Sequence, residues 1–495
     1  MSIFTKRPAR VLIVGSGASG IAAAYALGKC PDRFDVHVWE KSALPGGVAS
    51  SVRIEGPGNL FINDGVQGGT RSYRNVLNLM TEFGFVGSPV YLKISFGKGP
   101  TAWSNYKKTQ LTDTHKDEIK KFDRTLRIIN KFECVFVFVP ISKVMQWFGH
   151  SDEFCNQMVL PLVALFFATG NQTPNVSSAV IARVFLDDKL RMFDYDPERL
   201  LSQMPEMFIF PNLCEMYQTI VKKIACTFHG ERTVEFVNRE QGKVFVTDDK
   251  GCQEEFDEII FSCTAETVLA VLRNPTFMER KVLGNIEYYN DVTITHEDEE
   301  YMAKHYELNT NVDQYFIRSD PDDPTKLEMS FNLSNYQPQL KGCGRNIYQT
   351  IFLNDAAKSA WTINEINTNK IRLEKWWRKF SHSWRHFAFT VPFMRYIQGT
   401  KHTWYCGTYT LIGTHEVAVI SGLTAAYRLG AKYPFPQDDL AKMQFEDHLL
   451  LCHGKTARFG CNKDTVVSIC MAPLMRIFLV TALCLQFFVR CFRKD

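Results

Sequence analysis

The chain has 495 residues, of which 45% are hydrophobic and 22% are charged. This length exceeds what one hydrophobic core usually serves, so at least two domains are expected, and the composition excludes an intrinsically disordered protein. The formal net charge of +4 is too small to predict a nucleic-acid partner. The 14 cysteines form no C-x-x-C pair and no cluster with histidine, so neither a metal site nor a disulfide framework is predicted.

The segment 10–40 is typical of a strand, turn, helix and second strand. An apolar strand is predicted over 11–14 and an alanine-rich helix over 21–27. The turn between them carries the motif G-x-G-x-x-G. Its glycines are Gly15, Gly17 and Gly20, and Ser16 and Ser19 occupy variable positions of the same predicted dinucleotide site. In this motif the first glycine permits a tight turn, the second lets a pyrophosphate approach the backbone, and the third lets the helix pack on the strand. The N-terminus of the helix then faces the phosphates.

Glu40 directly follows the second strand, which is predicted over 35–39. It lies about twenty residues after Gly20, where a carboxylate can accept hydrogen bonds from an adenosine ribose. A glycine turn that binds nothing is the alternative interpretation. The strand, the helix and the acidic residue around the motif favour a dinucleotide site.

The segment Lys41 to Val48, KSALPGGV, places Gly46 and Gly47 shortly after the acidic residue. It resembles the E-x(5)-G-G stretch of two-domain flavoproteins, in which the backbone passes close to the FAD phosphates and the ribityl chain. The resemblance implies FAD as the cofactor. It also implies that Lys41, Gly46, Gly47 and Val48 form part of the FAD site.

Residues 59–85 are typical of an apolar strand, an Asn63-Asp64-Gly65 turn and an amphipathic helix. This stretch resembles the flavin-dependent amine oxidase superfamily, where it delivers backbone beside the flavin, here at Val66. More narrowly, it is similar to the predicted FAD/NAD-binding oxidoreductases associated with cyclopropane-fatty-acid synthases. In those proteins an Asp-x-Gly turn also precedes a helix.

The stretch 397–435 extends this resemblance, because its I-Q-G, T-W, C-G, H-E and S-G elements occur in the order of that family. A strand is predicted to end at Gly407 and a helix to start near Glu416. The helix N-terminus would present backbone N–H groups and a positive dipole to the flavin. The resemblance therefore implies that Gly407, His415, Glu416 and Val417 contact FAD. His415 either donates to the flavin or caps the helix, and it is the one candidate catalytic side chain.

The segments between these motifs are assigned to a second domain and to a stretch in which the chain returns to the first domain. Residues 117–224 are predicted to be helical and rich in aromatic residues. A hairpin over 233–246 and a buried strand over 255–262 lead back to the first domain, and the resemblance places the backbone of Val234 at the adenine. His296 and Asp298 are too few for a metal site and are predicted as turn residues.

The predicted fold class is α/β, with a discontinuous doubly wound, Rossmann-type FAD-binding domain interleaved with an α+β substrate domain. The FAD-binding domain is assigned to 1–95, 225–285 and 395–440, and the substrate domain to 96–224 and 286–394. Residues 441–465 are predicted as a linker.

A hydrophobic C-terminal helix is predicted over 466–489, followed by Arg490, Arg493 and Lys494. Its apolar length suffices to cross a bilayer, although it contains Arg476. A helix lying in the membrane interface and a terminal core helix are the alternatives. Because no apolar stretch precedes the first strand, the expectation is a tail-anchored membrane protein with its catalytic domain in the cytosol.

The expected function is that of an FAD-dependent oxidoreductase in which flavin N5 accepts a hydride from an apolar, lipid-like substrate, by oxidation or desaturation. The 38 phenylalanines and the apolar tail favour a lipid. One alternative is an amine oxidase acting on a small or secondary-metabolite amine. Another is a non-catalytic escort protein that carries prenyl groups or lipids, as Rab escort proteins do with this architecture. The intact Glu40, Gly46, Gly47 and His415 argue against the escort protein.

Overall fold

The computed structural model describes residues 7–55, 60–167, 169–186, 206–308, 312–320, 323 and 326–457. The chain divides into two compact units, Met1–Gly454 and Lys455–Asp495, and the first contains nearly all of the described residues. The predicted membrane segment 466–489 lies outside them. Within the described ranges, none of the helices has the length and apolarity needed to cross a bilayer.

A five-stranded parallel sheet forms the centre of the nucleotide-binding part, in the order β10-β2-β1-β14-β20. Its strands come from three distant stretches of the chain: β1 (Ala9–Val14), β2 (Phe34–Trp39), β10 (Thr227–His229), β14 (Glu258–Phe261) and β20 (Thr403–Tyr405). Residues 11–14 of β1 are buried, as expected for a central parallel strand with both faces covered. The Rossmann-like α/β architecture predicted from the sequence is thus present.

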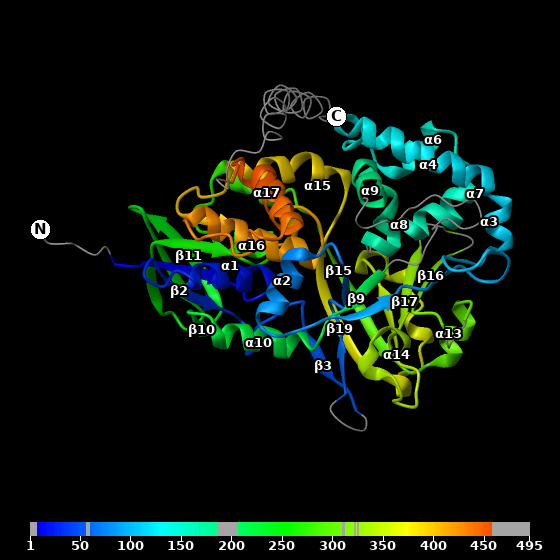
Figure 1. Ribbon diagram of the computed structural model, residues 1–495, viewed down its shortest axis with the longest axis horizontal. Coiled ribbons are helices and arrows are strands. Elements are labelled where there is room, and N and C mark those ends of the chain that lie inside the picture. Colours follow the sequence, from blue (N-terminus) through cyan, green and yellow to red (C-terminus); the bar gives the residue numbers. More distant parts are fainter. Residues whose placement is uncertain are drawn as a thin grey trace, which may run out of the picture. The chain divides into compact units, whose positions relative to one another are not determined.

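Two helices, α1 (Ala18–Gly28) and α16 (His415–Leu429), lie side by side in this part of the molecule (Figure 1). They approach so closely that a Cβ atom built on Gly422 would lie 2.0 Å from the carbonyl oxygen of Ser19. Glycine at position 422 therefore permits this packing. It fixes the N-terminal end of the domain against its C-terminal end.

A separate three-stranded meander contains β11 (Val234–Glu240), β12 (Lys243–Asp248) and β13 (Gln253–Phe256). The single strand predicted over 255–262 is wrong, because it is split between β13 in the meander and β14 in the central sheet. Asp257 stands at the break, where its carboxylate accepts hydrogen bonds from Arg10 N at 2.8 Å and from Lys243 Nζ at 2.6 Å. These contacts hold the chain where it passes from one sheet to the other.

A seven-stranded sheet, in the order β19-β15-β18-β17-β16-β7-β8, forms the second part of the unit. Its strands are mostly antiparallel, and only β16 and β7 pair in parallel. They are β7 (Ile94–Phe96), β8 (Trp103–Ser104), β15 (Tyr288–His296), β16 (Tyr315–Ser319), β17 (Leu327–Asn332), β18 (Tyr348–Phe352) and β19 (Ile371–Phe380).

Helices gather at one end of this second part and share a large apolar core with the sheet (Figure 1). They are α3 (Gln110–Thr114), α4 (Lys116–Lys131), α5 (Glu133–Phe136), α6 (Ile141–Trp147), α7 (Asp152–Phe154), α8 (Leu160–Phe167) and α9 (Ser178–Phe185). In α4, Ile119, Phe122, Leu126 and Ile129 follow helical spacing and are fully buried. The helical, aromatic character predicted for this stretch is observed.

The remaining elements connect the two parts or cover their edges. The short strands are β3 (Ser51–Arg53) paired with β4 (Phe61–Asn63), and β5 (Gly68–Thr70), β9 (Glu206–Ile209) and β6 (Ser88–Tyr91) in a further sheet. The helices are α2 (Arg74–Glu82), α10 (Leu213–Lys223), α11 (Ala265–Val271), α12 (Phe277–Leu283), α13 (Glu299–His305), α14 (Leu333–Tyr336) and α15 (Trp384–Phe389).

Residues 441–453, predicted as part of a linker, instead belong to helix α17 (Asp439–His453). The side chain of Asp438 caps the helix by accepting from Ala441 N at 3.1 Å. Ala441, Phe445 and Leu449 are fully buried at a spacing of four residues. This apolar stripe holds α17 against the nucleotide-binding part, so these residues do not form a linker.

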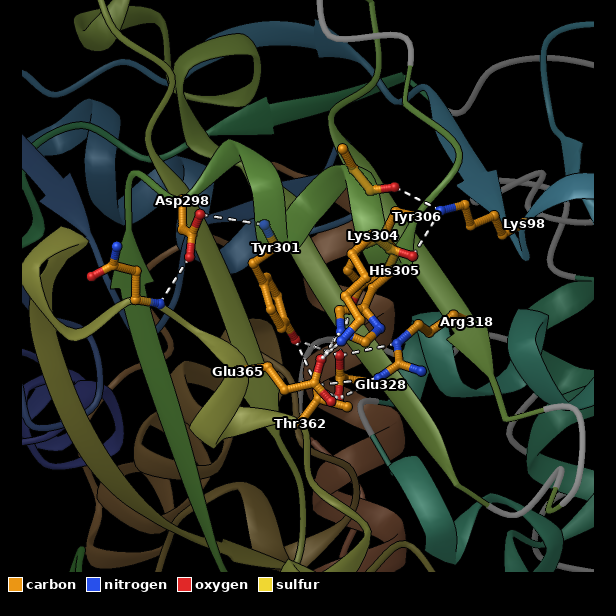
Figure 2. Close-up of polar contacts among 12 residues, drawn as sticks. Lys98, Asp298, Tyr301, Lys304, His305, Tyr306, Arg318, Glu328, Thr362 and Glu365 are labelled. Atoms are coloured by element: carbon orange, nitrogen blue, oxygen red, sulfur yellow. Dashed lines mark hydrogen bonds and ion pairs between the residues drawn. The ribbon is translucent and has the colours of Figure 1, made fainter.

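A polar cluster is buried where α13 packs on the seven-stranded sheet, and Figure 2 shows it around Glu328. Glu328 pairs with Arg318 at 3.0 Å, and its carboxylate accepts hydrogen bonds from the hydroxyls of Tyr301, Tyr306 and Thr362 at 2.7 to 2.9 Å. Nearby, the side chain of Asp298 caps α13 by accepting from Tyr301 N at 3.3 Å. The polar groups of this cluster satisfy one another, which is the condition for burying a charge.

Candidate functional site

The glycine motif forms a tight turn between β1 and α1. Gly15 has a positive φ of +96°, and a Cβ atom on it would lie 2.9 Å from the carbonyl oxygen of Ser262. A Cβ atom on Gly20 would lie 2.1 Å from the carbonyl oxygen of Gly15. These two glycines are therefore required by the turn and by the helix packing, as predicted from the motif.

Gly17 differs from its neighbours because its surroundings are open. Its φ of −65° is accessible to any residue, and no atom of the described residues lies within 4 Å of a Cβ atom built on it. Gly17 is also the N-cap of α1, where the first backbone N–H groups of the helix have no partner within the helix. The space beside Gly17 can therefore receive an anionic group.

Glu40 lies over this turn and is 8% exposed. Its Oε2 atom accepts hydrogen bonds from the backbone N and the Oγ of Ser16, both at 2.8 Å, and its Oε1 atom accepts from Ser42 N at 2.9 Å. Segment 229–232 lies alongside, because Glu40 N donates to His229 O and Arg232 N donates to Glu40 O. The carboxylate is thus fixed at the carboxyl end of β2.

The second glycine pair packs directly against the first motif. Gly46 N donates to Ser16 O at 2.9 Å, and Gly46 forms a parallel bridge with Gly17. A Cβ atom on Gly47 would lie 3.2 Å from Gly17 Cα. Lys41 and Val48 are exposed on either side of this contact. Glycines from two distant turns therefore form one cradle with bare backbone on both sides.

The turn that contains Asp64, Gly65 and Val66 extends this cradle. A Cβ atom on Gly65 would lie 2.2 Å from Val48 O, so the turn touches the segment that follows Gly47. Asp64 is 1% exposed and pairs with Lys375 Nζ of β19 at 2.7 Å. Val66 is half-buried beside it. Neither Asp64 nor Lys375 was predicted as a site residue, because the contact joins two segments far apart in the sequence.

Gln67 continues the same segment and is 7% exposed. Its Nε2 donates to Gln349 Oε1 at 2.6 Å, while Gln349 Nε2 faces the carbonyl oxygen of Asp64 at 3.3 Å. Because that carbonyl can only accept, it fixes the orientation of both amides. The Oε1 atom of Gln67 has no hydrogen-bond partner among the described residues. A buried acceptor thus remains available in this segment.

The loop after β20 leads into α16. Gly407 has a φ of +137°, and its backbone N donates to Ser421 Oγ at 2.8 Å. The N-cap of α16 is Thr414, whose side chain accepts from Val417 N at 3.2 Å. Of the two alternatives for His415, capping of the helix is therefore wrong, and donation to the flavin stays a prediction. The close contact of Gly422 with Ser19 brings this helix to the first motif.

His415 and Glu416 are both buried, and their side chains contact other helices. His415 Nε2 forms a 2.7 Å hydrogen bond with the hydroxyl of Tyr217 on α10, and burial lowers the pKa of His415 to about 4. Glu416 accepts from Asn75 N and Val76 N, at the N-terminus of α2, at 2.8 and 2.9 Å. Burial raises the pKa of Glu416 to about 7. The Glu416 carboxylate is therefore engaged in joining α16 to α2.

Tyr217 connects His415 to the glycine cradle, since its ring lies 3.8 Å from a Cβ atom built on Gly46. The sequence motifs gave no signal for Tyr217. Val234 begins β11 two residues after Arg232, whose guanidinium lies 3.5 Å from the ring centroid of Trp39. The predicted residues thus lie around one region at the carboxyl end of the central sheet, where ligands bind in open α/β folds.

Residues 13–83 match the family described as an NAD(P)-binding Rossmann-like domain. A comparison with curated proteins finds no match. Solved structures of similar fold cover most of the chain. A CLA-producing fatty acid isomerase from P. acnes superposes with a TM-score of 0.62 at 15% identity, covering 86% of this chain and 99% of that chain.

Two other solved structures show the same likeness. A putative protoporphyrinogen oxidase from Exiguobacterium sp. 255-15 has a TM-score of 0.63 at 13% identity, with 85% of this chain and 98% of that chain covered. Cyclohexylamine oxidase from Brevibacterium oxydans IH-35A has a TM-score of 0.58 at 13% identity, with the same coverage. At these identities the comparisons show a shared fold, and this fold agrees with the one implied by the predicted resemblance to the flavin-dependent amine oxidase superfamily.

Proposed function

We propose that this chain is an FAD-dependent oxidoreductase acting on an apolar, lipid-like substrate. The observation that carries the proposal is the double glycine cradle. Gly17 leaves open space at the N-terminus of α1, Gly46 and Gly47 press bare backbone against it, and the fixed carboxylate of Glu40 lies at the edge. This arrangement fits the two phosphates and the ribose of a dinucleotide.

The residues present would hold FAD along its whole length. Glu40 would accept hydrogen bonds from the adenosine ribose, Gly15–Gly20 and Gly46–Gly47 would face the pyrophosphate, and Val234 would lie at the adenine. Val66, Gly407 and the N-terminus of α16 would surround the flavin. When bound, FAD supplies an acceptor for a hydride from the substrate.

The chain itself orients these groups and controls charge near them. The N-terminus of α16 carries a positive partial charge, which would stabilise negative charge developing nearby. His415 is held by Tyr217 and is neutral above a pH of about 4, because burial lowers its pKa to that value. The Asp64–Lys375 pair fixes the turn that carries Val66. These residues position the site, and we assign no acid or base role to them.

The lipid-like substrate is supported by the 38 phenylalanines of the chain and by the apolar length of residues 466–489. A fatty acid isomerase is also among the proteins of similar fold. A cyclohexylamine oxidase in the same set keeps an amine as the second candidate substrate. The cradle and Glu40 disfavour an escort protein without flavin.

The test is purification followed by anaerobic titration. The full-length protein should be yellow and should release FAD on denaturation, identified by mass spectrometry. Unsaturated fatty acids and phospholipids should bleach the flavin absorbance faster than a panel of primary and secondary amines. Faster bleaching by amines would show that the protein is an amine oxidase and not a lipid oxidoreductase. A colourless, folded protein that binds a prenylated peptide would overturn the oxidoreductase proposal.

We also infer membrane attachment through residues 466–489, which supports a lipid substrate by placing the enzyme beside it. The inference rests on the apolar length of this segment and on the basic residues that follow it. Truncation of the chain before Thr465 tests this inference.

A further inference from the structure

An exposed apolar surface lies where α4 ends and α5 begins. Ile128, Phe132 and Val135 are 39%, 50% and 52% exposed. Their neighbours Ile129 and Phe136 are buried, at 0% and 9% exposure, and already supply the core-facing side of these helices. The three exposed side chains thus point away from the core. We call Ile128, Phe132 and Val135 the α4–α5 apolar corner.

A basic stripe runs along α4 beside this corner. Lys120, Arg124, Arg127 and Lys131 are exposed and recur at spacings of three or four residues, so they share one side of the helix. The acidic residues of α4 offset this charge only partly. Glu118 contacts His150 at 2.7 Å, Asp123 pairs with Arg127 at 3.1 Å, and Asp117 is exposed. In total, α4 contains six basic and three acidic residues.

The geometry points to a docking surface for an anionic membrane, formed by the α4–α5 apolar corner and the basic stripe. Partly exposed apolar side chains next to lysine and arginine are the pattern by which a helix rests in the headgroup region of a bilayer. The apolar side chains enter the acyl boundary and the cations meet anionic headgroups. This contact is separate from residues 466–489 and does not depend on the proposed flavin chemistry.

The charge complementarity favours a lipid surface over a second copy of the chain. In a symmetric contact between two copies, the same patch meets itself, so basic stripes would face each other and repel. The helices α4 and α6 lie at the outer edge of the helical end of the unit in Figure 1, and the side chains of the corner are exposed there. A peripheral contact here would fix the orientation of the protein on the bilayer.

An exposed cysteine of the chain can report whether this surface is covered. Cys134 is exposed within the corner, and Cys252 is exposed far along the chain, in the turn between β12 and β13. Full-length protein is treated with a maleimide, and the modification of each cysteine is measured by peptide mass spectrometry. Vesicles of phosphatidylcholine with about 30% phosphatidylserine should slow labelling of Cys134 severalfold and leave Cys252 unchanged. Pure phosphatidylcholine vesicles should protect Cys134 much less.

A double variant, Phe132→Ser with Val135→Ser, should weaken the anionic-lipid protection of Cys134 about tenfold in lipid concentration. Phe277→Ser is the matched control, because Phe277 is 65% exposed on α12, outside the corner. Equal labelling of Cys134 with and without anionic vesicles would overturn the proposal. Slow labelling of Cys134 without vesicles would also overturn the proposal in two cases. If the slow labelling depends on protein concentration, a second copy of the chain covers the corner. If it disappears on removal of 466–489, the tail covers the corner.

Discussion

Gly17 and Gly20 belong to the same motif but have opposite structural requirements. A valine at position 17 has an accessible backbone conformation and open space, whereas a valine at position 20 would collide with Gly15 O. We therefore expect Gly17→Val to abolish FAD binding while leaving the melting temperature of the FAD-free protein close to that of FAD-free wild type. Gly20→Val should lower the melting temperature itself. Flavin stoichiometry and thermal unfolding, measured on both variants, check the prediction.

The companion change is Glu40→Ala, which removes the acceptor proposed for the ribose. Loss of hydrogen bonds to a charged group costs about 1.5 to 3 kcal/mol, so FAD affinity should fall at least about tenfold. Retention of a full complement of FAD by Gly17→Val would show that the cofactor does not pass over this turn.

Glu416 is a second residue whose role depends on its surroundings. Its carboxylate accepts from Asn75 N, Asn75 Nδ2 and Val76 N, whereas a glutamine would turn an NH₂ group toward one of these donors. Glu416→Gln should therefore destabilise the fold by roughly 1 to 3 kcal/mol. The exposed Glu266, which pairs with Arg378, provides the control variant Glu266→Gln, with a small effect expected.

The effect of Glu416→Gln should also depend on pH. Burial raises the pKa of Glu416 to about 7 in the folded state, so folding takes up a proton that the unfolded chain does not hold until about pH 4.5. The contribution of Glu416 to stability is therefore complete below about pH 4.5 and is lost as the pH rises through 7. Denaturant unfolding at pH 5 and pH 8 should show a larger difference between wild type and variant at pH 5.

At the scale of elements, the glycine motif unit could be predicted because its signals are local. The strand, the turn glycines and the acidic residue all lie within 10–40, and the structure contains β1, α1 and β2 there. The elements that were mispredicted depend on distant partners. The break at Asp257 is held by Arg10, and the side chain of His415 by Tyr217. No periodicity in the sequence encodes such pairings.

Helix α17 was missed for a different reason. Phe445 and Leu449 have helical spacing, but the stretch lies between a flavin motif and an apolar tail and contains several charged residues. The cap at Asp438 and the apolar stripe were the available signals. For the candidate site, the backbone positions could be predicted from motifs, while Tyr217, Lys375 and Gln349 required the fold.

The cluster around Glu328 contains a buried ion pair whose contribution to stability can be measured. Glu328→Gln leaves the guanidinium of Arg318, whose side chain is 15% exposed, without its charged partner. Removing one member of a buried pair typically costs about 3 to 5 kcal/mol. The matched change Glu365→Gln breaks contacts of a more exposed carboxylate with Lys304 and His305, and about 1 kcal/mol or less is expected. Equal losses in denaturant unfolding would contradict this interpretation.

At the scale of the whole molecule, burial gives several histidines strongly lowered pKa values. These are about 4 for His296, His386 and His415, and about 3 for His382 and His448. Below about pH 6.5 the unfolded chain binds protons that the folded protein does not. For each such proton, the free energy of unfolding falls by about 1.4 kcal/mol for every unit by which the pH is lowered.

The protein should therefore lose stability steeply as the pH falls from 6.5 toward 4, because these contributions are complete only above about pH 6.5. Denaturant midpoints at pH 7.5, 6.5 and 5.5 measure this slope. Glu416 acts in the opposite direction but supplies only one proton. A midpoint that stays constant from pH 7.5 to pH 5.5 would show that these histidines are not buried in the neutral form.

Removal of the tail tests the inferred membrane attachment. Truncation before Thr465 leaves the whole of the unit Met1–Gly454, so flavin content should be unchanged. Full-length protein should resist extraction by salt and alkali, whereas the truncated protein should be released. Detergent-free solubility of the full-length protein, or loss of flavin on truncation, would argue for a role of 466–489 in the folded core.

The order of strands in the central sheet constrains how the protein can be made. β20 is the edge strand beside β14, and α16 follows it, yet both emerge from the ribosome long after β1 and β2. Until then the nascent chain holds an incomplete parallel sheet, with one edge open and the surface of α1 at Ser19 uncovered. Such intermediates are slow to form and prone to aggregation. Cells should therefore need chaperones during its synthesis, and ribosome-stalled chains ending before β20 should be far more protease-sensitive than those that include α16.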